Sequence, residues 1–68
     1  MNPNQIQAYD DSIQYCNQLL NLLEQEKDSI RGCFKGEPLR AYLAATEAAI
    51  HRTKMIRSVL ESLQAMQQ

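Results

Sequence analysis

The chain has 68 residues and a mass of 7.8 kDa, which is enough for one small domain over residues 1–68. At this size folding buries only about 60% of the surface of the unfolded chain, so small folds usually add a disulfide, a metal or a second chain. The hydrophobic content of 44% excludes a disordered tail, and the net charge of −1 excludes a strongly basic nucleic-acid clamp.

The N-terminal segment has the wrong composition for an export signal. Residues 1–11 contain neither a basic region nor an apolar region, and the longest wholly apolar run in the chain covers residues 41–45. Cys16 and Cys33 are 17 residues apart, which is about 25 Å along one helix and too far for a disulfide. We therefore expect a cytoplasmic protein with two free thiols and no membrane-spanning helix.

The first half of the chain has the spacing of one long amphipathic helix. Asn2 suits the N-cap of this helix and Pro3 suits its first helical position. We predict a helix over residues 3–35. Gly32 is its weak point, since a glycine inside a helix costs about 1 kcal/mol relative to alanine. At alternating steps of three and four residues, eight of nine positions are apolar: Ile6, Tyr9, Ile13, Cys16, Leu20, Leu23, Lys27, Ile30 and Phe34.

A short turn should follow this helix. Gly36, preceded by the basic Lys35, has the place of a glycine that ends a helix, and Pro38 suits an early position of the next one. Because the connection is so short, the second helix, predicted over residues 38–66, must fold back on the first. The predicted fold is an all-α antiparallel two-helix hairpin.

The second helix has more apolar surface than one neighbouring helix covers. Its apolar side chains spread over an arc of about 240°, whereas one neighbour covers about 100°. Either a second copy or a different protein should cover the rest, and the periodicity leaves open which part of the arc faces the first helix. The polar stripe consists of Arg40, Glu47, His51, Lys54, Ser58 and Glu61.

Catalytic and metal-binding motifs are missing from the sequence. His51 is the only histidine and lies on the polar stripe, while Asp10 and Asp11 point about 100° apart on a helix. We therefore predict no enzyme, no cofactor, no metal and no small-molecule substrate. The densest basic cluster spans more than about 200° of the helix and disfavours nucleic-acid binding; it consists of His51, Arg52, Lys54 and Arg57.

Residues 20–66 resemble the YscE-like family of small co-chaperones of bacterial type III secretion. The Asn- and Gln-rich start, Pro38 and the two cysteines depart from the pattern of that family. The likeness rests on the basic-glycine turn and on an Ala- and Glu-rich second helix with an early tyrosine: Lys35, Gly36, Tyr42, Ala45, Glu47, Ala48, Ala49, Ile50, Ile56, Val59 and Leu63.

The resemblance implies a cytosolic heterodimer with a helical-repeat, TPR-like chaperone. The pair would stabilise the repeat protein and keep a needle subunit soluble until export. The alternative is a homodimeric four-helix-bundle regulator or adaptor, with nucleic acid as one candidate ligand and self-association in the absence of a partner. The predicted partner-binding residues are Leu39, Tyr42, Leu43, Ala49, Ile50 and Ile56.

Overall fold

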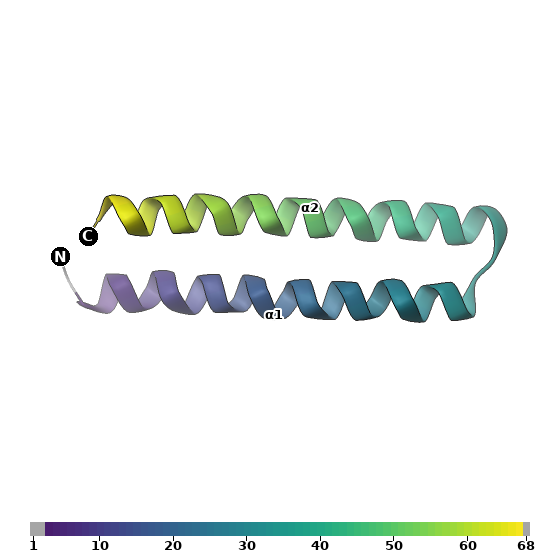
Figure 1. Ribbon diagram of the computed structural model, residues 1–68, viewed down its shortest axis with the longest axis horizontal. Coiled ribbons are helices and arrows are strands. Elements are labelled where there is room, and N and C mark those ends of the chain that lie inside the picture. Colours follow the sequence, from purple (N-terminus) through teal and green to yellow (C-terminus); the bar gives the residue numbers. More distant parts are fainter. Residues whose placement is uncertain (1–2, 68) are drawn as a thin grey trace.

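The computed structural model describes residues 3–67 and consists of two long helices. Helix α1 covers Pro3–Cys33 and helix α2 covers Gly36–Met66. The helices run antiparallel side by side, so that the start of α1 lies beside the end of α2 and the turn lies at the other end (Figure 1). The predicted all-α antiparallel hairpin is confirmed. The predicted N-cap, Asn2, lies outside the described residues.

Helix α1 packs on α2 through the stripe that the sequence predicts. Cys16, Leu20 and Ile30 are buried, and the other members of the stripe up to Lys27 are half-buried. Gly32 does not interrupt the helix, which ends two residues before the predicted residue 35. The Phe34 amide still donates to the Ile30 carbonyl at 2.9 Å, but its side chain is exposed because the chain is already turning away.

The turn uses its glycine differently from the prediction. Gly36 was expected to end the first helix, yet it is the first residue of α2 and has a φ of 69°. Lys35 precedes it as an extended N-cap residue without a side-chain capping bond. Helix α2 thus begins two residues before the predicted Pro38. Proline is tolerated there, because the first four amides of a helix have no partner inside it.

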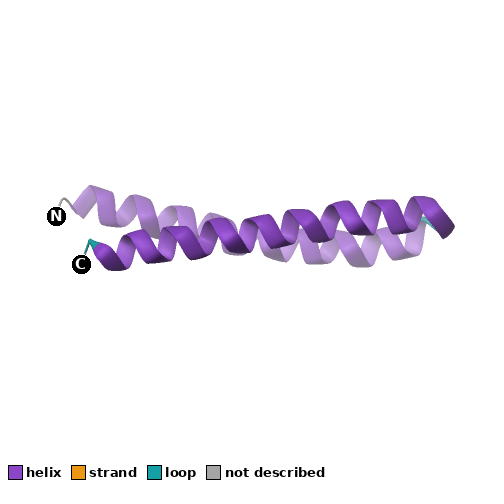
Figure 2. Cartoon of the chain, turned by 90° about the horizontal axis from the view of Figure 1, so that it is seen from above, coloured by secondary structure: helices purple, strands orange, loops and turns teal. Residues whose placement is uncertain are grey.

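The hairpin is long and thin. Its Cα atoms extend over 52 × 15 × 10 Å, and seen from above the helices cross at a shallow angle (Figure 2). Among residues 3–67 no large side chain is completely buried. Two helices have one line of contact between them, so each keeps most of its circumference open. The sides of the helices that point away from this line decide what the hairpin can bind.

Candidate partner-binding surface

The side of α2 that packs on α1 is only half apolar. The Thr46 and Thr53 hydroxyls are buried there and donate to the carbonyl oxygens of Tyr42 and Ala49, at 2.9 and 2.8 Å. Such bonds within the helix satisfy the hydroxyls without a partner on α1. The inner seam of α2 recurs at steps of four and three, and all its members are buried or half-buried: Leu39, Leu43, Thr46, Ile50, Thr53, Arg57, Leu60 and Gln64.

Polar contacts between the helices line one flank of the hairpin. All three pairs belong to one register of the two antiparallel helices. The residue numbers rise by seven and then by ten along α1, and they fall by the same amounts along α2. Exposed polar pairs contribute at most about 1 kcal/mol each, so these contacts align the helices more than they stabilise them. The pairs are Asp10 with Gln64, Asn17 with Arg57 at 2.8 Å, and Lys27 with Glu47 at 3.5 Å.

A second seam on α2 is more apolar than the first, lies about 100° around the helix from it and is not covered by α1. Seven of its eight positions are apolar, and all are exposed except the half-buried Ala49. The Val59 side chain, for example, is 57% exposed. Large exposed apolar surfaces mark sites of association. This outer seam of α2 consists of Tyr42, Ala45, Ala49, Arg52, Ile56, Val59, Leu63 and Met66.

Helix α1 has a matching outer seam on the same side. Ser12 and Tyr15 line a shallow hollow together with Ile56 of α2, and Glu26 of α1 is hydrogen-bonded to Tyr42 of α2. The two outer seams therefore form one continuous surface, which we call the apolar face. The outer seam of α1 consists of Ala8, Ser12, Tyr15, Leu19, Leu22, Glu26, Ser29 and Cys33.

Tyr42 links the two helices at the turn end of the apolar face. Its ring stacks on Phe34, with centroids 5.5 Å apart and planes at 26°. The Glu26 carboxylate accepts a hydrogen bond from the phenol and repels the phenolate, which raises the pKa of Tyr42. The tyrosine is 44% exposed, so its ring is both part of the hairpin and accessible to a partner.

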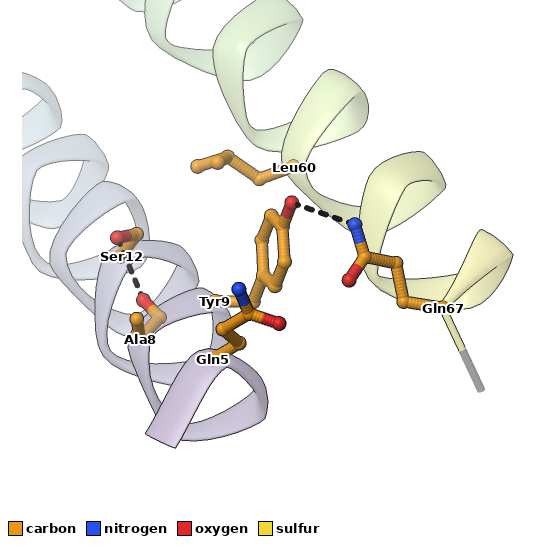
Figure 3. A pocket seen from close by; sticks show the side chains of 6 residues that line it. All are labelled: Gln5, Ala8, Tyr9, Ser12, Leu60 and Gln67. Atoms are coloured by element: carbon orange, nitrogen blue, oxygen red, sulfur yellow. Dashed lines mark hydrogen bonds between the residues drawn. The ribbon is translucent and has the colours of Figure 1, made fainter. Parts of the chain in front are cut away.

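A small hollow lies at the opposite, open end of the hairpin (Figure 3). The Tyr9 ring points towards Leu60 and Gln67, and the Gln67 amide donates to the Tyr9 hydroxyl at 3.4 Å. Gln5, Ala8 and Ser12 complete the lining, which includes no carboxylate, imidazole or amine. Apart from the phenol of Tyr9, this hollow has no group for acid–base chemistry. We interpret it as a shallow depression between the two helices and not as an active site.

The structure divides the six predicted partner-binding residues between the two seams. Tyr42 and Ile56 are exposed on the apolar face, and Ala49 is half-buried beside them. Leu39 and Leu43 are half-buried on the inner seam. Ile50 is only 7% exposed, so its side chain packs on α1 and is not on the outer surface of the hairpin. For the accessible residues the partner-binding role stays a prediction.

Several residues of the apolar face were missing from that prediction. Val59, Leu63 and Met66 belong to the outer seam of α2, and Tyr15 and Leu22 belong to that of α1. A signal for them exists in the sequence. Each outer-seam residue directly precedes a position of the inner register. Each helix therefore has two patterns with alternating steps of three and four residues, and they are offset by one residue.

Among residues 3–67, the other charged and thiol groups do not gather into a second site. Arg52 lies on the apolar face, whereas Arg57 points to the opposite flank and donates to Asn17, so the basic cluster is divided between two sides. Cys16 is buried and Cys33 is exposed, both as free thiols. In the part of the chain that the structure describes, no group of three or more His, Cys, Asp or Glu residues could hold a metal ion.

The comparisons with known proteins returned no relative: no family model, no curated protein and no solved structure matches the chain. Over the described residues, neither helix combines the length and apolarity that a membrane span requires.

Proposed function

We propose that this chain works by binding a helical protein through its apolar face, as a type III secretion co-chaperone of the YscE-like kind. The observation that carries the proposal is the outer seam of α2, which is apolar at seven of eight positions and exposed. Folding of the hairpin leaves this seam open. A binding protein is the class of function that uses such a surface.

The spacing of the apolar face supports a helical partner. Side chains at alternating steps of three and four form ridges that fit the grooves of another α-helix. Helical-repeat proteins stack helix pairs into extended surfaces that present many such grooves. In the proposed complex the hairpin pairs with a TPR-like chaperone in the cytosol and stabilises it. The needle subunit is reached only through that chaperone.

The proposed contacts centre on α2. Tyr42 and Ile56 are accessible members of the predicted set, and Val59 lies one turn from Ile56 in the same seam. Residues in the desolvated centre of an interface contribute most of its binding energy, and tyrosine is enriched among them. We therefore place the centre of the interface at Ile56 and Val59, with Tyr42 as the anchor near the turn.

Co-expression with a TPR-like helical-repeat chaperone of a type III secretion system tests the proposal. The native chain should co-purify with it, and Val59→Asp should weaken the complex by about 30-fold or more, the loss typical of a central interface residue. Ser58→Asp is the matched control, because it puts the same charge on the neighbouring, exposed residue of the polar stripe. A native chain that does not co-purify, or equal binding by both variants, would contradict the proposal.

A further inference from the structure

We infer that, when no partner is bound, a second copy of this chain covers the apolar face in an antiparallel arrangement, α1 on α1 and α2 on α2. The two hairpins then form a four-helix bundle with a two-fold axis perpendicular to the helices. The inference rests on the proposed function only in using the same face. It identifies a second copy of the chain as the occupant of that face when no partner is present. Self-association and partner binding then compete for the same surface.

The angle between the two seams fits a four-helix bundle. Each outer-seam residue directly precedes a position of the inner register, as Tyr42 precedes Leu43 and Leu22 precedes Leu23. One residue turns an α-helix by about 100°. In a four-helix bundle every helix packs on two neighbours at nearly a right angle to each other, so each helix here already has both surfaces that such a bundle requires.

The outer seam of α2 is complementary to itself when reversed. Its first half is small, with Ala45 and Ala49, and its second half is large, with Val59 and Leu63. An antiparallel pair centred between Arg52 and Ile56 places each alanine opposite a large side chain of the other copy. Small residues facing large ones fill an interface at native packing density, whereas a parallel pair would leave a gap at the alanines.

The outer seam of α1 has its centre at the same level. Its two leucines, Leu19 and Leu22, flank residues 20–21, and they face each other when two copies of α1 run antiparallel. The register of the hairpin places residues 20–21 of α1 opposite residues 53–54 of α2, because it pairs Asn17 with Arg57. One two-fold axis therefore centres both helix pairs at once.

The size and charge of the apolar face also suit a second copy. The Cα extents of 52 Å and 15 Å in the plane of the helices outline a footprint of roughly 800 Å² per copy, similar in size to the accessible surface of about 800 Å² that each partner buries in a standard interface. The ion pair of Lys27 with Glu47 lies on the other flank, outside the proposed interface. Arg52, the one charged residue of the outer seam of α2, lies two residues from the two-fold axis, where its stem packs on the seam while its guanidinium reaches solvent at the side of the bundle.

Cys33 makes the arrangement testable by crosslinking. In the antiparallel pair, Ala8 of one copy lies opposite Cys33 of the other, and both are exposed in the hairpin. Within one chain these positions are 25 residues apart on the same helix, about 37 Å, so only an intermolecular link joins them. Treatment of Ala8→Cys with a short bismaleimide should yield a covalent dimer linked between position 8 and Cys33.

Two controls accompany this experiment. The native chain should give no crosslink, because the two Cys33 residues lie at opposite ends of the antiparallel bundle. Ala8→Cys combined with Cys33→Ser should give none either. A crosslink in the native chain would overturn the inference in favour of hairpins with their turns at the same end, and a position 8 to Cys33 link absent from Ala8→Cys would overturn it too.

Light scattering tests the self-association directly. The isolated native chain should have twice the 7.8 kDa mass of one chain at tens of micromolar concentration, Ser58→Asp should match it, and Val59→Asp should be a monomer. A native monomer at that concentration would overturn the inference while leaving the proposed function intact. The proposed function is tested separately by the co-expression experiment. A chain that forms the dimer but binds no helical-repeat protein would contradict the proposed function and leave this inference intact.

Discussion

The two seams of α2 are opposite in chemistry and in burial. The inner seam includes four polar residues among eight and is covered by α1, whereas the outer seam includes one polar residue among eight and is exposed. A fold selected only for the stability of one chain would bury the more apolar seam, since burial of apolar surface is the dominant favourable contribution to folding. The difference is the observation on which the proposed role of the outer seam in association rests.

The contrast also explains how polar residues are tolerated between two helices. Thr46 and Thr53 bond within their own helix, and Arg57 reaches the flank to bond Asn17 and pair with Glu61. The inner seam thus keeps its polar groups satisfied, which avoids the cost of burying them without partners. The hairpin holds its register through these groups, and the large apolar side chains of the outer seam stay exposed.

The largest expected effect on stability comes from introducing a negative charge into the inner seam of α2 and, for comparison, into its outer seam. Ile50→Asp places an unpaired carboxylate at a position that is 7% exposed, and it should destabilise the hairpin by on the order of 3 to 5 kcal/mol. Val59→Asp places the same group in water and should leave the helices intact. Thermal unfolding followed by circular dichroism measures both.

This comparison should be made at low concentration. Loss of a dimer also lowers the apparent stability of an associating chain, so dilution below the dissociation constant isolates the effect on the hairpin. An Ile50→Asp chain that melts like the native one would show that the inner seam is not where the structure places it.

The next largest effect on stability comes from shortening a leucine to alanine in the inner or the outer seam of α1. Leu20 is 8% exposed and Leu22 is 59% exposed. Leu20→Ala should lower the free energy of unfolding by about 2 to 5 kcal/mol, and Leu22→Ala should change it by about 0.5 kcal/mol or less. Urea titration of the dilute proteins gives both values. Equal losses in the two variants would mean that α1 does not pack through the predicted stripe.

The smallest effect concerns pH and the one group that joins the two outer seams. The pKa of Tyr42 is raised above its ordinary value of 10.0 by Glu26. Because the folded pKa is the higher one, the stabilising contribution is complete below about pH 10 and is lost as the pH rises through the folded pKa. We expect the hairpin to lose stability in this alkaline range.

Glu26→Gln tests the cause. It removes the negative charge, so Tyr42 should titrate at a lower pH, as measured by tyrosinate absorbance in a background in which Tyr9 and Tyr15 are phenylalanine. The alkaline loss of stability should shrink in the same variant. An unchanged titration of Tyr42 would show that the carboxylate does not reach the phenol.

Much of the fold could be predicted from the sequence because α1 has one dominant apolar register. From Ile6 to Ile30 only Lys27 is charged in that stripe, and the structure buries the whole stripe to some degree. The short turn with its glycine predicts the reversal. The place of Gly36 was predicted wrongly, since a glycine with positive φ commonly follows the end of a helix, whereas here it is the first residue of α2.

The candidate site was harder to predict because α2 has two registers that differ by one residue. Periodicity shows that both exist, and the rule that apolar residues go inside favours the outer one. The structure selects the other register, which places Ile50 inside and Val59 outside. Contacts between residues far apart in sequence make that choice, and a single helix pattern contains no information about them.

The sequence by itself determined that this small chain is two helices folded back on each other, with more apolar surface than the fold can cover. Local spacing and a short turn are sufficient for that conclusion, since both act within a few residues. Only the tertiary structure decided which side of α2 meets α1. The turn at Gly36 and the pairing of Asn17 with Arg57 set the rotation of one helix against the other, and that rotation leaves the more apolar seam exposed.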